Sequence, residues 1–180
     1  MSRIGRLPVA IPDGVTVSCD NNVVTVKGKL GELTQKIDSV INVTIDNGHV
    51  VLTRNSEDKE VRAKHGLYRA LIHNMVVGVS EGYKRVVVAK GVGYRVTKQG
   101  DKIVLNIGYS KPVEVSPVDG IKLDTQDADK VVVSGINKEL VGQVAAKIRS
   151  IRPVEPYHGY GLRYDDEVVI KKEGKKAGKK

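Results

Sequence analysis

The sequence lacks phenylalanine and tryptophan, and Cys19 is its one cysteine. A single cysteine cannot form a disulfide within the chain, so a disulfide-bonded scaffold is excluded. No apolar run approaches the roughly 20 residues that a membrane-spanning helix requires. Gly5, Pro8 and Pro12 interrupt the amino-terminal segment before it reaches the apolar length of a signal peptide. We therefore expect a soluble cytoplasmic protein with a mainly aliphatic core.

Positive charge is in excess. Lysine and arginine number 30 against 21 aspartate and glutamate residues, which gives a net charge of +9 at pH 7. Such a balance points to a polyanionic partner or an anionic surface. Charge alone leaves RNA, DNA and a membrane surface open.

Two stretches of the first half recur about eighty residues later. The sequence VVTVKG at residues 23–28 matches IVLNIG at 103–108, and HVVLT at 49–53 matches KVVVS at 130–134. Their alternating, β-branched character is typical of strands. An internal duplication is the simplest explanation.

Short alternating segments predict strands in both halves. Those of the first half span residues 15–19, 23–27, 33–37, 43–45 and 50–53, with turn signals at Asn21-Asn22 and Asn47-Gly48. Those of the second half span residues 85–90, 94–98, 103–107, 113–116, 121–124 and 131–134.

One amphipathic helix is predicted at the end of each half, over residues 58–76 and 138–151. The first apolar stripe comprises Val61, Tyr68, Leu71, Ile72 and Met75, and the second comprises Leu140, Val141, Val144, Ile148 and Ile151. A lone helix of this length is marginal in water, so we expect each helix to cover one face of its own sheet.

The predicted fold class is α+β, with two similar small domains that each pack a mainly antiparallel sheet against one helix. We place the amino-terminal domain with its basic arm at residues 1–82, the carboxy-terminal domain at 83–170 and a lysine-rich tail at 171–180. The tail holds six lysines and one glutamate, so it is expected to be disordered unless it binds RNA. Its alternative role is to keep the protein soluble.

Motifs for catalysis are absent from the sequence. The GVGYR stretch at residues 91–95 lacks the third glycine and the following helix of a dinucleotide site, so we predict a bulge or a tight turn. No nucleophile elbow is present, and Asp165, Asp166 and Glu167 are expected to balance neighbouring cations rather than form a catalytic pair. We expect no enzymatic activity and no cofactor.

The histidines do not form a metal site. They are His49, His65, His73 and His158. No pair of them has the spacing of zinc ligands. His65 falls beside the apolar stripe of the first helix, so we expect a packed or capped side chain there.

Cations and tyrosines gather toward the carboxyl end. Three of the seven tyrosines lie in PVEPYHGYGLRYDDE at residues 153–167. Aromatic and guanidinium groups in such a loop can stack on unpaired bases, although Tyr157 and Tyr164 could instead pack beneath the loop. The candidate RNA-binding residues are Arg3, Arg6, Lys147, Arg149, Arg152, Tyr157, His158, Tyr160, Arg163, Tyr164, Lys171, Lys172, Lys175 and Lys176.

Longer stretches resemble one family. HGLYRALIHNMVVGVSEGYKRVVVAKGVGYR at residues 65–95 and LVGQVAAKIRSIRPVEPYHGYGLRYDDE at residues 140–167 are similar to the middle and the signature region of the bacterial large ribosomal subunit protein L6 family. SRIGRLPVAIPDGV near the amino terminus and GYSKPVEV at 108–115 fit as well. The resemblance covers nearly the whole chain.

This resemblance implies a structural constituent of the large subunit with two similar α+β domains and no catalytic activity. It implies binding to 23S rRNA, chiefly through the carboxy-terminal domain, near the translation-factor site and the stalk base. Neighbouring large-subunit proteins would be further partners, and translation factors would lie nearby. No metal, membrane or small-molecule substrate is expected.

The loop departs from the family pattern at two lysine positions. The family reads Arg-Pro-Glu-Pro-Tyr-Lys-Gly-Lys-Gly, whereas this chain has Val154 before Glu155 and places His158 and Tyr160 at the two lysines. Histidine is only partly charged at neutral pH, and tyrosine is neutral. We expect this loop to bind RNA with less dependence on salt than its relatives.

A hypothesis from another class is a protein adaptor whose exposed strands recruit factors while the tail serves solubility. Ribonuclease treatment separates the two hypotheses, because an adaptor would keep its partners when RNA is destroyed.

Overall fold

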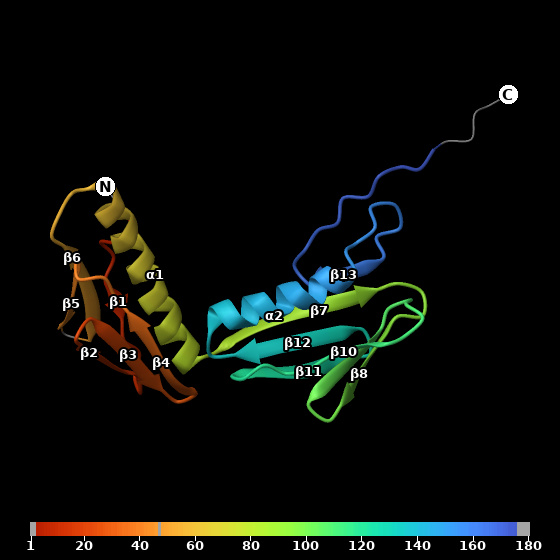
Figure 1. Cartoon of the computed structure of the whole chain (residues 1–180), viewed down its shortest axis with the longest axis horizontal. Coiled ribbons are helices and arrows are strands. Elements are labelled where there is room, and N and C mark those ends of the chain that lie inside the picture. The colour runs from red at the N-terminus through yellow and green to blue at the C-terminus, as the bar shows by residue number, and fades with distance from the viewer. Residues whose placement is uncertain (1–2, 47, 176–180) are drawn as a thin grey trace. The chain divides into compact units, whose positions relative to one another are not determined.

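The computed structural model describes residues 3–46 and 48–175, and the chain forms two compact units (Figure 1). The first unit is Met1–Tyr83 with Ile136–Lys138, and the second is Lys84–Gly135 with Glu139–Lys180. In the part of the chain that the structure describes, neither helix has the length and apolar character needed to cross a membrane.

The first unit contains two small sheets and one helix. Its elements are β1 (Val9–Ala10), β2 (Thr16–Asp20), β3 (Val23–Gly28), β4 (Gly31–Lys36), β5 (Ile41–Asp46), β6 (His49–Arg54) and α1 (Lys59–Ser80). Strands β2, β3 and β4 form one antiparallel sheet in that order, and β1, β6 and β5 form another. Asn21 and Asn22 adopt positive φ angles of 48° and 61°, which suits the tight hairpin predicted there.

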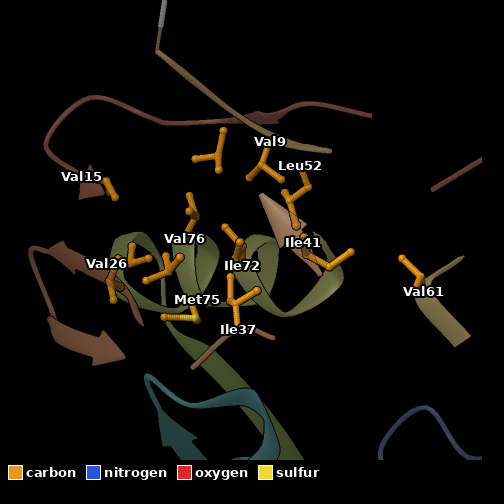
Figure 2. Close-up of a cluster of buried hydrophobic side chains, with 13 residues drawn as sticks. Val9, Val15, Val26, Ile37, Ile41, Leu52, Val61, Ile72, Met75 and Val76 are labelled. Atoms are coloured by element: carbon orange, nitrogen blue, oxygen red, sulfur yellow. The ribbon is translucent and has the colours of Figure 1, made fainter. Parts of the chain in front are cut away.

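The core of the first unit is aliphatic (Figure 2). Helix α1 contacts strands of both sheets, and its Ile72, Met75 and Val76 are buried in one cluster with Val26 and Ile41. Burying each such side chain contributes about 1.5–3 kcal/mol, so this cluster is the main stabilising feature of the unit. It forms because the predicted apolar stripe of α1 faces the sheets.

His65 is buried beside this core, which confirms its predicted packing. Its Nε2 lies 3.0 Å from the carbonyl oxygen of Leu52, and its Nδ1 lies 3.2 Å from the guanidinium of Arg54. The carbonyl can only accept, so Nε2 carries the proton and Nδ1 accepts from Arg54. His65 is therefore held by packing and hydrogen bonds.

Helix α1 is four residues longer than predicted at its carboxyl end. Val79 is fully buried, which extends the packed face beyond residue 76. The helix ends at Ser80, and two residues later Gly82 has a φ of 80° and donates its N–H to the carbonyl of Val77 at 3.1 Å. The same carbonyl also accepts from the N–H of Glu81 at 2.9 Å, and a left-handed glycine just past the last turn is a common helix end.

The second unit repeats this plan. Its elements are β7 (Tyr83–Lys90), β8 (Arg95–Gln99), β9 (Lys102–Asn106), β10 (Val113–Val115), β11 (Ile121–Asp127), β12 (Lys130–Gly135), α2 (Lys138–Ile151) and β13 (Gly161–Tyr164). Strands β8, β9 and β10 correspond to β2, β3 and β4, while β7, β12 and β11 correspond to β1, β6 and β5. The predicted duplication and the α+β fold class are confirmed.

Helix α2 has the bounds that the sequence predicts, and its Val141, Val144 and Ile148 are buried. The turn predicted after β7 is also confirmed: the N–H of Tyr94 lies 3.4 Å from the carbonyl of Gly91, and Gly93 has a φ of 73°. Two short strands, β1 and β13, fall where no strand is predicted. Each exists because a longer strand, β6 or β7, supplies its pairing partner.

Candidate nucleic-acid interface

The connection between α2 and β13 is a loop of residues 152–160 that folds on itself. The N–H of Glu155 donates to Tyr160 at 2.8 Å, and the N–H of Gly159 donates to Glu155 at 3.0 Å. Gly161 closes the loop, because a Cβ at this position would lie 2.7 Å from the carbonyl oxygen of Pro153. The 152–160 loop therefore has a defined path.

The first residues of the lysine-rich segment return to this loop. The N–H of Lys172 donates to the carbonyl of Pro156 at 2.9 Å. Lys171, Lys172 and Lys175 are all exposed, whereas Lys176 lies outside the described residues. The described tail thus begins with lysine side chains in solvent beside the loop.

Two tyrosines of the loop point outward. Tyr157 is 53% exposed and Tyr160 is 38% exposed. His158 lies 3.1 Å from the carboxylate of Glu155, and its ring stacks on Tyr160 with a centroid distance of 5.4 Å. Tyr157 therefore does not pack beneath the loop, which is one of the two roles that the sequence allows for it.

Glu167 joins the end of β13 to α2. Its carboxylate accepts two hydrogen bonds from Arg149, at 2.8 and 2.5 Å, and one from the backbone N–H of Tyr164 at 3.1 Å. The hydrogen bonds from Arg149 are the main reason that the pKa of Glu167 falls from its ordinary value near 4.5 to about 2. Arg149 is therefore engaged within the protein.

Tyr164 is half-buried, and two guanidinium groups lie over its ring. The guanidinium carbons of Arg85 and Arg149 lie 4.4 and 5.5 Å from its ring centroid. Arg85 also pairs with Asp166 at 3.1 Å. The predicted charge-balancing role of Asp166 and Glu167 is confirmed.

Arg163 is half-buried in the same region. It approaches the backbone carbonyl of Glu167 at 3.5 Å through one terminal nitrogen, and its Nε is buried without a hydrogen-bond partner among the described residues. Lys147, on α2, is exposed. The structure thus separates lysines in solvent from arginines that contact the protein.

Arg152 links the end of α2 to two other loops. It donates to the carbonyl of Ile107 at 2.8 Å, and its guanidinium carbon lies 5.5 and 5.0 Å from the ring centroids of Tyr94 and Tyr109. Together with Arg85, these tyrosines are absent from the residues that the sequence singled out. The family resemblance was the signal available for them, because the stretch at residues 65–95 contains Arg85 and Tyr94 and the stretch at 108–115 contains Tyr109.

Arg3 and Arg6 belong to the first unit. Both are exposed. Their segment lies on α1, where Arg69 donates to the carbonyls of Leu7 and Pro8 at 3.1 and 3.2 Å. The amino-terminal arm is thereby fixed to its own unit.

Among residues 3–46 and 48–175, no group of His, Cys, Asp and Glu side chains could hold a metal ion. The duplicated α+β scaffold, the ordered loop and the exposed lysines define a two-unit protein with a candidate nucleic-acid interface on its second unit.

Comparison with known proteins identifies the family. The profile of the family described as ribosomal protein L6 matches residues 11–82 and 90–165. The large ribosomal subunit protein uL6 of Clostridium kluyveri is 55% identical over 181 residues, covering all of both chains. Those of Clostridium botulinum and Clostridium beijerinckii are each 54% identical over the same full lengths. The chain belongs to the ribosomal protein L6 family, so it is a structural constituent of the ribosome, as the resemblance implied.

Proposed function

We propose that the chain binds 23S rRNA of the large ribosomal subunit, mainly through its second unit, near the translation-factor site and the stalk base. Neighbouring large-subunit proteins are further partners, and translation factors act nearby. We take residues 83–170 as the rRNA-binding domain, 171–180 as a tail that binds phosphates, and 1–82 as a domain with a smaller basic arm.

One observation carries this proposal: the lysine-rich segment is hydrogen-bonded to the 152–160 loop. The bond from Lys172 to Pro156 places exposed lysines beside Tyr157 and Tyr160. Lysines neutralise phosphates and exposed rings stack on bases. A loop that is ordered in this way also loses less conformational entropy on binding.

The candidate residues divide by their surroundings. Lys147, Lys171, Lys172 and Lys175 are exposed and suit direct contact with phosphates. Arg149, Arg163 and Tyr164 contact Glu167 or each other, so we assign them the role of holding β13 and the loop in place. His158, paired with Glu155, is assigned a contact through its ring rather than through a fixed charge.

The test is the salt dependence of binding to 23S rRNA by filter binding. Substituting Lys171, Lys172 and Lys175 with glutamine should reduce the slope of log affinity against log salt by about 2–3, because three phosphate contacts are lost. Deleting residues 171–180 should reduce it by about 3–5.

The matched control substitutes three exposed lysines of the first unit, Lys29, Lys36 and Lys59, with glutamine. This control removes the same charge and should leave the slope unchanged. Equal slopes for the wild type, the tail variant and the control would refute the role of the tail.

A further inference from the structure

Three loops of the second unit meet around Arg152. The β7–β8 loop (residues 91–94) contributes Tyr94, and the β9–β10 loop (residues 107–112) contributes Tyr109. The third is the 152–160 loop, which begins at Arg152 itself. In Figure 1 the β7–β8 loop follows the arrowhead of β7. It lies at the same end of the β11-β12-β7-β13 sheet as the loop that leads into β13. The residues that converge here are far apart in sequence.

Tyr109 is fixed at two points. Its hydroxyl donates to the carbonyl of Ile151 at 2.8 Å, and its ring lies 5.0 Å from the guanidinium carbon of Arg152. Nevertheless Tyr109 is 50% exposed. A tyrosine that is held by both its hydroxyl and its ring, yet half in solvent, offers a rigid aromatic surface.

At Gly108 the backbone of the β9–β10 loop lies close to the side chain of Arg152. The φ of Gly108 is 78°, and a Cβ there would lie 3.3 Å from both a terminal nitrogen of Arg152 and the ring of Tyr94. A side chain at this position would therefore need its neighbours to shift by a few tenths of an ångström, and the positive φ also favours glycine. This contact fixes the position of Tyr109, the next residue.

A free cation lies two residues beyond Tyr109. Lys111 is exposed, and no carboxylate pairs with it in the described part of the chain. Tyr109, Ser110 and Lys111 form a continuous exposed surface, which we call the β9–β10 patch. It adjoins the 152–160 loop through the bond between Tyr109 and Ile151.

We propose that the β9–β10 patch is a second rRNA contact, in which an unpaired base stacks on Tyr109 and its phosphate is neutralised by Lys111. Arg152 is then a positioning residue for Tyr109 and not a phosphate contact. The inference rests on the proposed binding to 23S rRNA. A patch of three residues is far smaller than the roughly 800 Å² per partner of a stable protein interface, whereas one ring and one cation suit one nucleotide.

Binding of the full chain to 23S rRNA, measured against salt, tests the patch. Tyr109→Leu should weaken binding about 5- to 150-fold without changing the slope, because stacking on a base is not electrostatic. Tyr109→Phe should retain most of the affinity. Lys111→Gln should reduce the slope by about 0.7–0.9, whereas Lys122→Gln, an exposed lysine on β11, should not.

The role of Arg152 has its own readout. If it positions Tyr109, then Arg152→Lys and Arg152→Gln should weaken binding equally and leave the slope unchanged, since neither retains the planar guanidinium that lies against the rings of Tyr94 and Tyr109. If the slope of log affinity against log salt falls with Arg152→Gln and is restored with Arg152→Lys, then Arg152 is a phosphate contact and not a positioning residue. Circular dichroism melting identifies any variant that fails to fold, and a photo-crosslinking phenylalanine at position 109 then tests the patch in the assembled subunit.

Crosslinking of position 109 to 23S rRNA is the expected result. If the wild type binds 23S rRNA with a tail-dependent slope but Tyr109→Leu and Lys111→Gln bind like the wild type, the patch is refuted and the proposed function stands. Crosslinking to a protein overturns the patch in the same way. Failure of the wild type to bind 23S rRNA at all overturns both proposals.

Discussion

The two units of the chain share one order of strands and helix but differ in charge and in aromatic content. Residues 84–180 contain 20 lysines and arginines against 12 aspartates and glutamates, whereas residues 1–83 contain 10 against 9. Five of the seven tyrosines also lie in residues 84–180. The same scaffold therefore carries two different surfaces.

The most concentrated positive charge lies on a segment that follows the duplicated plan, because residues 171–180 hold six lysines and one glutamate. After α2 the chain adds the 152–160 loop, β13 and the lysine-rich tail, and within the described residues β13 has no counterpart in the first unit. Both units bury an aliphatic helix face against their sheets. The comparison shows that the core and the candidate interface are separable, and the following predictions test that separation.

The largest effect should come from matched core substitutions. Ile72 in α1 and Ile148 in α2 are both almost fully buried. Ile72→Ala and Ile148→Ala should each lower the free energy of unfolding by about 2–5 kcal/mol, through lost burial and the cavity left behind. Denaturant unfolding measures the loss, and hydrogen exchange shows which unit loses protection.

The control is Leu67→Ala, an exposed position on α1, which should change the stability by less than about 0.5 kcal/mol. Each core variant should lose protection first in its own unit. If either substitution caused an equal loss of protection in both units, the inference that each unit has its own core would be wrong.

Two helical glycines should respond in opposite directions. A Cβ on Gly78 of α1 would lie 2.1 Å from the backbone oxygen of Ile136, whereas a Cβ on Gly142 of α2 has nothing within 4 Å. Gly78→Ala should destabilise by about 1–3 kcal/mol because the helix is forced away from its neighbour. Gly142→Ala should stabilise by about 0.5–1 kcal/mol, because alanine is the better helix former. Thermal melting of the two variants measures both, and shifts of the same sign would contradict this explanation.

A modest, pH-dependent effect concerns the Arg149–Glu167 pair of the second unit. Glu167→Gln should destabilise by about 1–2 kcal/mol at pH 7, a modest value because Arg149 is partly exposed. The pKa of Glu167 lies near 2 in the folded protein, below its ordinary 4.5. Its contribution is therefore present above about pH 4.5 and is lost as the pH falls toward 2.

Urea unfolding at pH 7, 4 and 3 measures this dependence. The difference between the wild type and Glu167→Gln should shrink as the pH is lowered. Glu32→Gln, which breaks an exposed pair with Lys27 in the first unit, should cost less than about 0.5 kcal/mol. A difference at Glu167 that stays constant from pH 7 to pH 3 would refute the assignment.

The sequence predicts elements well where one periodic pattern decides them. The bounds of α2 are as predicted, and the strands of the β2-β3-β4 and β8-β9-β10 sheets lie within one or two residues of their expected positions. β13 could not be predicted, because residues 161–164 are too few and too close to proline and glycine to show a period. Their strand conformation depends on pairing with β7.

The candidate interface could likewise be predicted from the sequence only in part. The sequence identifies the lysine-rich segment and the outward tyrosines of the loop, since composition alone marks them. It does not identify Arg85, Tyr94 or Tyr109, because their partners are distant along the chain. Tyr109 bonds to a residue 42 positions away, and Arg85 to one 81 positions away.

By itself, the sequence determines the duplication, the α+β class and the family, because these follow from local periodicity and from stretches that read continuously. Only the tertiary structure decides which cations remain in solvent and which contact the protein. Arg149 and Lys147 are two residues apart on one helix, yet Arg149 is bound to Glu167 and Lys147 is exposed. The physical reason is that a carboxylate or a ring must arrive from another part of the chain, and only folding brings it there.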